Sequence, residues 1–280
     1  MTRWLVTGAR GMLGADLVTL LRGEGEQVAA LGRDELDVRD PDAVSRAVRL
    51  HKPDAVVNCA GWTAVDDAET REPEALAVNG HAVRALARGC DELGARLVQV
   101  STDYVFDGAA RRPYREDDPT GPLGAYGRSK LAGERAALEH GHLVVRTAWL
   151  YGAHGANFVR TMVRLESERD TVTVVDDQTG QPTWTADLAA ELVRLVRADA
   201  PGGVYHATNA GQTTWYGFAR EIFAMLGADP DRVRPVGSSR FPRPARRPAY
   251  SVLARRAGPA MRDWRRALQA AWPSVVGGVR

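Results

Sequence analysis

The segment Trp4-Leu5-Val6-Thr7-Gly8-Ala9-Arg10-Gly11-Met12-Leu13-Gly14 decides the fold of this chain. Its first four residues are typical of a short buried strand, and three glycines follow with the spacing G-x-x-G-x-x-G. Leucines at positions 13, 17, 20 and 21 then predict a helix. This order is typical of a dinucleotide-binding unit, because the glycines let a pyrophosphate approach the free N–H groups of the helix. A glycine-rich turn that binds no ligand is the alternative.

Four further apolar runs follow in the first half of the chain, and helical patterns separate them. The runs lie at 28–31, 54–57, 97–102 and 143–146, and helices are expected at 41–51, 72–93 and 126–140. Such alternation predicts an α/β fold, here a Rossmann-like, doubly wound parallel sheet over residues 1–149. Ligands bind outside the carboxyl ends of such strands, so the polar residues after the five strands are expected to meet in one crevice. The long polar segment 103–124 is expected to be a functional loop or lid.

The residues after the second strand bear on the choice of dinucleotide. An acidic residue at this place selects NAD by binding the ribose hydroxyls, but this chain has Gly32 followed by Arg33. An arginine there can pair with the 2′-phosphate of NADP, and Arg10 in the first loop can reach the same group. We therefore expect NADPH rather than NADH, although a shift of one residue would place Asp34 at the ribose.

Tyr126 and Lys130 stand four residues apart, so they share one face of a helix. An ammonium beside a phenol lowers the pKa of the phenol from its usual value of roughly 10. Such a tyrosine can give a proton to a carbonyl oxygen near neutral pH. Ser101 or Thr102, at the end of the preceding strand, adds a hydroxyl. The spacing alone occurs on many solvated helices, so this prediction depends on the dinucleotide crevice beside it.

The regular alternation ends after Trp149. Helices are expected at 157–165, 187–197, 215–226 and 261–272, extended runs at 171–175 and 204–207, and irregular chain at 235–248, which is rich in Pro and Arg. We expect residues 150–280 to form mainly a smaller, interleaved substrate-binding lobe, from which some elements return to the sheet.

Three side chains of this half are candidates for substrate contacts. Trp149 follows the fifth strand, where it stacks on a sugar ring or else belongs to the core. Arg246 and Arg247 lie in a proline-flanked loop, where they bind a diphosphate or else stay solvated. The 6 histidines form no ligand pair and are expected to be structural or solvated.

The composition argues against several classes of function. The chain has 280 residues, 44% of them apolar, and a formal net charge of +2, which gives no reason to expect nucleic acid or a membrane as a partner. No apolar run reaches the ~20 residues of a membrane-spanning helix, and the N-terminus lacks the apolar stretch of a signal peptide. Cys59 and Cys90 allow at most one disulfide and have no metal-ligand spacing. We therefore expect a cytoplasmic protein.

Several segments, which together run through most of the chain, are similar to one enzyme family in sequence and in order. They lie at 7–14, 53–58, 63–66, 101–108, 126–134, 146–152, 157–158, 177–183 and 244–248. Ser-Thr-Asp-Tyr-Val-Phe at 101–106 and Pro-Ala-Arg-Arg-Pro at 244–248 are far more specific than the glycine loop. The chain thus resembles the dTDP-4-dehydrorhamnose reductase family, within the extended short-chain dehydrogenase/reductase superfamily.

The resemblance implies roles for many residues. It places Thr102, Tyr126 and Lys130 in the catalytic triad, and Thr102, Asp103 and Trp149 in contact with substrate. The expected cofactor contacts, including those of the loop and the second strand, are Gly8, Arg10, Gly11, Met12, Leu13, Gly14, Arg33, Asp37, Val38, Ala60, Gly61, Thr63, Tyr126 and Lys130. Trp62 is expected to shape the nicotinamide pocket.

The resemblance also implies a homodimer, and some members of the family carry Mg²⁺ at the subunit interface. Asp16 and Asp187 are the carboxylates nearest to where its ligands would fall in this chain, and no ligand set is assigned.

The activity implied is NADPH-dependent reduction of the 4-keto group of a dTDP-4-keto-6-deoxy sugar, giving dTDP-L-rhamnose or a related deoxysugar. Tyr126 and Thr102 would meet the charge on the carbonyl oxygen, while Lys130 lowers the tyrosine pKa and binds the nicotinamide ribose. One alternative is a sugar-nucleotide epimerase or dehydratase, although a dehydratase would want a second acid where this chain has Tyr104. The other is a non-catalytic NADP-binding regulatory subunit, a class that tends to lose the tyrosine or the lysine.

Overall fold

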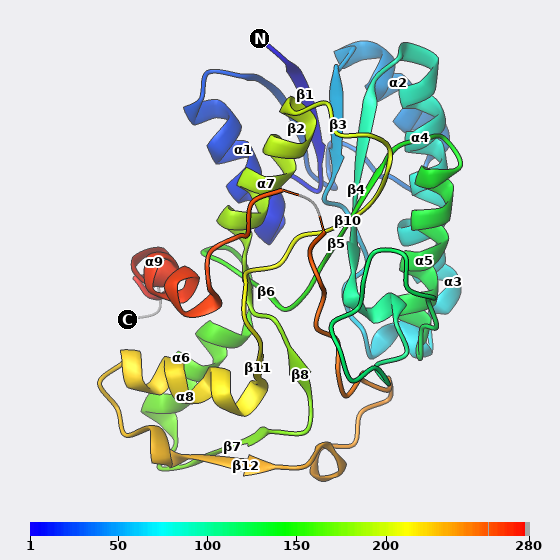
Figure 1. Cartoon of the computed structure of the whole chain (residues 1–280). Coiled ribbons are helices and arrows are strands. Elements are labelled where there is room, and N and C mark those ends of the chain that lie inside the picture. Colours follow the sequence, from blue (N-terminus) through cyan, green and yellow to red (C-terminus); the bar gives the residue numbers. More distant parts are fainter. Residues whose placement is uncertain (257, 278–280) are drawn as a thin grey trace.

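A six-stranded sheet forms the centre of the molecule, in a computed structural model that describes residues 1–256 and 258–277 (Figure 1). The strands pair in the order β10-β5-β4-β3-β1-β2, and every pair is parallel. Their bounds are β1 (Arg3–Thr7), β2 (Gln27–Leu31), β3 (Ala55–Asn58), β4 (Arg96–Thr102), β5 (Leu143–Thr147) and β10 (Gly203–His206).

Helices cover both faces of this sheet (Figure 1). One face carries α1 (Met12–Gly23) and α7 (Thr185–Arg197), and the other carries α2 (Pro41–His51), α4 (Ala82–Leu93) and α5 (Ala125–Leu138). The side chains of β1 alternate between the two cores, because Trp4 and Val6 pack with α1 and α7 while Leu5 packs with α2 and α4. The predicted doubly wound α/β fold is confirmed.

The winding of the chain reverses at β1, which has β2 on one side and β3 on the other. Loops that leave neighbouring strands toward opposite faces open a crevice at the carboxyl edge of the sheet. The glycine loop after β1 and the turn after β3 therefore border one crevice.

The helix predicted at 72–93 is continuous but not uniform. It comprises α3 (Glu72–Leu76), a π-helical turn (Ala77–His81) and α4. Such wide turns occur often at functional sites. Here the turn holds Asn79, a buried residue that bonds to the turn after β3, as described below.

The second half of the chain builds a smaller lobe around its own hydrophobic core. Its helices are α6 (Phe158–Glu168), α8 (Trp215–Met225) and α9 (Trp264–Val276). Its short strands form three pairs: β7 (Val172–Val175) with β12 (Val233–Val236), β6 (Leu150–Tyr151) with β9 (Thr183–Trp184), and β8 (Thr179–Gly180) with β11 (Thr213–Thr214). Short 3₁₀ turns lie at Asp67–Glu69, Asp103–Val105, Pro230–Arg232 and Ser238–Arg240. Between these lobe elements the chain returns to the sheet to add α7 and β10.

Several element bounds differ from the prediction by a few residues, and two of the differences have a clear local cause. Pro235, expected in irregular chain, lies in β12 opposite Val174 of β7; a two-stranded pair leaves one edge without hydrogen bonds, where the missing N–H of proline is tolerated. The last helix begins at Trp264 rather than Met261, because Asp263 caps it by accepting a hydrogen bond from the Arg265 N–H at 2.9 Å.

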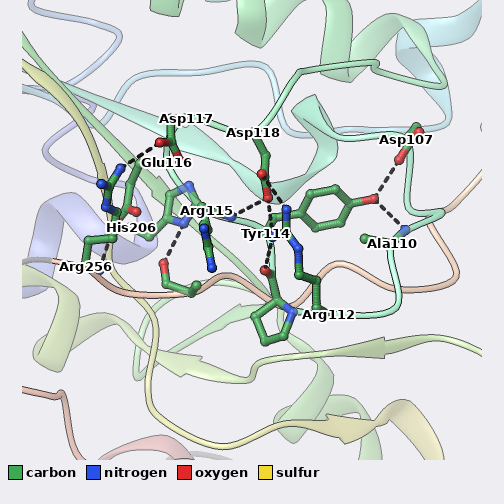
Figure 2. Close-up of polar contacts among 12 residues, drawn as sticks. Asp107, Ala110, Arg112, Tyr114, Arg115, Glu116, Asp117, Asp118, His206 and Arg256 are labelled. Atoms are coloured by element: carbon green, nitrogen blue, oxygen red, sulfur yellow. Dashed lines mark hydrogen bonds and ion pairs between the residues drawn. The ribbon is translucent and has the colours of Figure 1, made fainter.

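Polar contacts within the segment 103–124 stabilise its conformation (Figure 2). The Tyr114 hydroxyl donates to Asp107 at 2.6 Å, and Arg112 binds Asp118 with two hydrogen bonds of 2.8 Å. The Tyr114 N–H donates to the carbonyl of Val252 at 2.8 Å. This loop is thus joined to a segment far along the chain.

Two properties expected from the composition can be compared with the structure. Cys59 and Cys90 are both free thiols, so the disulfide that their number allows does not form. Over the described residues, no helix has the length and the apolar character that crossing a bilayer requires.

Candidate active site

The loop between β1 and α1 has the geometry that a pyrophosphate requires. Gly8 has a φ of +63°, and a methyl group there would lie 2.6 Å from the backbone nitrogen of Ala60. A methyl group on Gly14 would collide with the Gly8 carbonyl. No side chain caps the N-terminus of α1, so the N–H groups of its first turn are available to an anion.

A cavity of about 350 Å³ opens over this loop and extends to the ends of β2 and β3. Of the predicted cofactor contacts, those that line it are Gly8, Arg10, Gly11, Arg33, Asp37, Val38, Ala60 and Gly61. Trp62 lines it as well. The remaining loop residues, Met12, Leu13 and Gly14, form the first turn of α1, and Thr63 is exposed beyond Trp62.

The residues after β2 favour a phosphate over ribose hydroxyls. Arg10 pairs with Asp34 at 2.8 Å and also with Glu35, so both acids after the strand are engaged by an arginine. Arg33 lines the same cavity, and no carboxylate pairs with it in the part of the chain that the structure describes. An arginine in this position fits the 2′-phosphate of NADP.

Two further arginines line the cavity and were not predicted. Arg39 binds Asp37, with 2.6 Å between Nη2 and Oδ2, and these hydrogen bonds lower the pKa of Asp37 to about 2. Arg71 lies over the ring of Trp62, 4.7 Å from its centroid. Neither occupies a position at which dinucleotide motifs place an arginine, so the sequence carries no signal for them.

Asn79, in the π-helical turn, is a third residue that the motifs do not reveal. Its Oδ1 accepts from the Trp62 N–H at 2.9 Å, and its Nδ2 donates to the Trp62 carbonyl at 3.1 Å and to the Ser129 hydroxyl at 2.9 Å. It thereby joins the turn after β3 to α5. The widened helical turn, which has no sequence signature, brings it there.

The three predicted catalytic residues lie together at the ends of β4 and α5. Thr102 is the last residue of β4, and Tyr126 and Lys130 belong to the first two turns of α5. The Thr102 hydroxyl lies close enough to the Tyr126 phenol to lower its pKa. A methyl group on Gly61 would lie 3.9 Å from Lys130 Nζ, so the ammonium adjoins the first cavity.

The expected effect of Lys130 on Tyr126 is wrong for this structure. Burial raises the pKa of Tyr126 to about 12, and the nearby Thr102 hydroxyl opposes this only in part. Lys130 Nζ donates to the Val100 carbonyl at 2.5 Å instead. Burial also lowers the pKa of Lys130 to about 8. Tyr126 is thus a neutral phenol near pH 7, the form that can donate a proton.

Asp103 places a second titratable group beside the triad. It is 1% exposed, its Oδ1 accepts from Thr102 at 3.0 Å, and its Oδ2 has no partner among the described residues. Burial raises its pKa to about 6. The carboxyl group can therefore gain or lose a proton near neutral pH.

A second cavity, of about 520 Å³, lies on the other side of the triad. Its lining combines β7 with the aromatic rings of Tyr104, Phe158 and Trp215. The Tyr104 ring meets the Tyr126 ring edge to face, with 5.6 Å between centroids. Tyr126 thus adjoins a residue of the second cavity, while Lys130 on the same helix adjoins the first.

The arginines of the proline-flanked loop divide between cavity and surface. Arg247 lines the second cavity and pairs with Asp66, with 3.0 Å between Nη2 and Oδ2. Arg246 is exposed and is not part of the lining, whereas Arg243, which the motifs did not single out, is part of it.

Trp149 adopts a left-handed backbone conformation with a φ of +45°. Its ring stacks on Trp215 with 3.6 Å between centroids and 7° between planes. Gly180 packs against the same ring, because a methyl group there would lie 2.4 Å from Trp149 Cε2. Much of the indole is therefore covered by the protein itself.

The two carboxylates nearest to the expected magnesium site have partners within the chain. Asp16 accepts a hydrogen bond from Thr185, and Asp187 pairs with Arg262 at 3.0 Å. Within residues 1–256 and 258–277, no three His, Cys, Asp or Glu side chains gather as a metal site would need. The structure gives no support for Mg²⁺.

Comparison with known proteins identifies relatives over nearly the whole length. A family model described as "RmlD substrate binding domain" matches residues 2–275. The chain is 56% identical to a dTDP-4-dehydrorhamnose reductase of Streptomyces griseus, over 98% of this chain and 94% of the relative. It is 55% identical to a dTDP-4-keto-6-deoxy-D-glucose reductase of Streptomyces niveus, over 97% and 96%.

A solved structure agrees with these relatives. The dTDP-4-dehydrorhamnose reductase of Bacillus anthracis, in complex with NADP, superposes with a TM-score of 0.93 at 35% identity and covers 97% of this chain and 98% of its own. Because the family match spans almost every residue and the relatives exceed half identity, the chain belongs to the dTDP-4-dehydrorhamnose reductase family.

Proposed function

We propose that the protein uses NADPH to reduce the 4-keto group of a dTDP-4-keto-6-deoxy sugar, giving dTDP-L-rhamnose or a related deoxysugar. The observation that carries this proposal is the position of Thr102, Tyr126 and Lys130. Lys130 adjoins the cavity over the glycine loop, and Tyr126 contacts Tyr104 of the second cavity. A dinucleotide and a nucleotide-linked sugar can thus meet at one phenol.

Each side chain has a distinct part in the reaction. The bound cofactor supplies hydride. Tyr126 donates its proton to the carbonyl oxygen, and the Thr102 hydroxyl stabilises the charge that develops there. Lys130 holds the nicotinamide ribose, and Arg33 with Arg10 binds the 2′-phosphate.

The substrate contacts belong to the second cavity and the chain beside the triad. Asp103 and Trp149 contact the sugar, and Arg247 in the cavity lining faces the diphosphate, which Arg246 approaches from the exposed side of the same loop. In this proposal residues 1–149 bind the cofactor, and residues 150–280 carry most of the sugar-nucleotide contacts. The protein works as a homodimer in the cytoplasm.

Product identification tests the proposal. The names of the two relatives differ in the sugar, so the protein is incubated with NADPH and either dTDP-4-keto-6-deoxy-L-mannose or dTDP-4-keto-6-deoxy-D-glucose. The expected result is oxidation of one NADPH for each 4-hydroxy sugar detected by NMR. If the protein instead purifies with stoichiometric NAD and epimerises the sugar without consuming NADPH, the epimerase alternative holds.

A further inference from the structure

Three consecutive residues of β4 each contact a residue of α5, and the contacted residues lie one helical turn apart. The pairs are Val100 with Lys130, Ser101 with Glu134, and Thr102 with Tyr126. Residues four apart on a helix share a face, so the face that carries the phenol and the ammonium also carries a carboxylate. The first and third pairs contain the proposed catalytic groups. The second pair has no part in the chemistry described so far.

The Glu134 carboxylate is buried and receives hydrogen bonds from two neighbouring strands. The Ser101 hydroxyl donates to Oε1 at 2.5 Å. Arg146 of β5 donates through Nε to Oε1 at 2.9 Å and through Nη2 to Oε2 at 2.7 Å. Ser101 and Arg146 are direct neighbours in the sheet, so both side chains point to the face that α5 covers. Glu134 is 1% exposed and Arg146 is 4% exposed.

A buried ion pair of this kind is weak support for a stabilising role, because desolvation offsets the attraction and a hydrophobic pair of similar volume holds elements together as well. What the ion pair does provide is a defined position for the Glu134 carboxylate. The three donors are fixed on two strands, so all three hydrogen bonds form only when the carboxylate takes one position. That position in turn fixes how α5 lies along β4.

We propose that Glu134 is a positioning residue of the active site: its carboxylate joins α5 to the carboxyl ends of β4 and β5, and so sets Tyr126 and Lys130 against Thr102 and the cofactor crevice. The proposal depends on the proposed function for the identity of the reacting groups.

Glu134 also places a negative charge near a buried cation. Burial lowers the pKa of Lys130, and attraction to the Glu134 carboxylate opposes that effect. Removal of the carboxylate is therefore expected to lower the pKa of Lys130 further. A role confined to packing would leave that pKa where it is.

The sequence makes this pKa measurable one residue at a time. It contains two lysines, Lys52 and Lys130, and Lys52 is exposed at the end of α2. An NMR titration of protein labelled with ¹³C-lysine reports each side chain separately, with Lys52 as the internal reference. This measurement needs neither cofactor nor substrate.

The variants separate charge from packing. Glu134→Gln leaves Arg146 buried without its partner and can fail to fold, so the main variant is Glu134→Gln/Arg146→Gln, which removes both charges. Glu134→Asp keeps the charge on a shorter side chain. Ser101→Ala removes one hydrogen-bond donor and leaves the ion pair.

We expect the double variant to lower the pKa of Lys130, because the Glu134 carboxylate is among the charges that raise it, while Lys52 serves as the reference. We expect kcat to fall about tenfold or more, because small misplacements of catalytic groups have effects of that size. Glu134→Asp is expected to restore the pKa but only part of kcat, and Ser101→Ala to lower kcat without lowering the pKa.

An unchanged Lys130 pKa in the double variant, or a kcat equal to that of the wild type, overturns the proposal. Failure of the proposed function gives a different result, since the wild type would then reduce no 4-keto sugar nucleotide while the titration of Lys130 still responds to Glu134.

Discussion

Lys130 is buried and Tyr126 is partly buried, and removal from water shifts their pKa values in opposite directions. Burial raises the pKa of the Tyr126 phenol and lowers the pKa of the Lys130 ammonium. At neutral pH both groups are protonated, so the site begins the reaction with the proton already in place on Tyr126. The group whose titration limits activity is then Lys130.

Activity is accordingly expected to decline as pH rises through about 8, where Lys130 loses its charge. Tyr126 contributes nothing to this limb, because its pKa is about 12. Initial rates of NADPH oxidation between pH 6 and pH 10 measure the limb. A rate that stays constant across this range contradicts a role for the Lys130 charge.

Asp103 is expected to make the stability of the fold depend on pH. Its pKa is raised from 3.8 to about 6, so its contribution to the free energy of unfolding is fully present below the unfolded value and is lost as pH rises through about 6. Asp103→Asn cannot ionise, so the variant does not lose this stability as pH rises. Relative to the wild type, the variant is expected to gain roughly 2–3 kcal/mol between pH 4 and pH 7, as measured by urea unfolding. The same difference from the wild type at both pH values would argue against a buried, protonated Asp103.

Arg33→Asp tests the basis of cofactor choice. A hydrogen bond to a charged group is worth about 1.5–3 kcal/mol, so the dissociation constant of NADPH is expected to rise by about tenfold or more. NADH, which lacks the 2′-phosphate, should bind almost as before. Arg246→Asp is the matched control, because it changes the net charge equally at an exposed position outside the first cavity.

Fluorescence titration with each dinucleotide measures both constants. Equal weakening of NADPH and NADH by Arg33→Asp would mean that the arginine does not touch the phosphate.

At the scale of elements, the loop between β1 and α1 depends on glycine for two reasons that can be separated. Gly8 and Gly25 both have a positive φ, of +63° and +76°. Only at Gly8 would a methyl group meet the backbone of the turn after β3, whereas at Gly25 no heavy atom lies within 4 Å among those described. Both positions thus impose backbone strain on any other residue, but only Gly8 adds a steric conflict.

Gly8→Ala is expected to abolish detectable NADPH binding and to destabilise the fold by more than Gly25→Ala. The latter variant carries only the cost of the left-handed conformation, about 1–2 kcal/mol. Thermal unfolding and NADPH binding of both variants test this. Similar binding by the two would show that the close approach to Ala60 does not shape the cofactor site.

The elements themselves were largely predictable from the sequence, for local reasons. Asp40 and Pro41 start α2 where a cap and a first-turn proline are expected. Buried parallel strands such as β3 are short apolar runs with clear ends. The π-helical turn and the placement of Pro235 in β12 were not predictable, because both depend on contacts with distant segments.

At the scale of the whole molecule, the sheet and the lobe bring two cavities to the helix that carries Tyr126 and Lys130. Residues at strand ends were predictable because the topology of a parallel sheet gathers them at one edge. Arg39 and Arg243 were not, since each lies in its cavity through a loop that follows no motif. Asn79 was not either, since a widened helical turn brings it to the Trp62 backbone.

The central claim is that Tyr126 transfers a proton to a sugar carbonyl while the cofactor supplies hydride. The measurement that tests it most directly is incubation of the wild type and Tyr126→Phe with NADPH and each dTDP-4-keto-6-deoxy sugar, with the product identified by NMR. We predict a 4-hydroxy sugar from the wild type with one NADPH consumed per product, and a rate about 10²–10⁴-fold lower in Tyr126→Phe at saturating NADPH. No reduced sugar from the wild type, or an undiminished rate in Tyr126→Phe, would contradict the account.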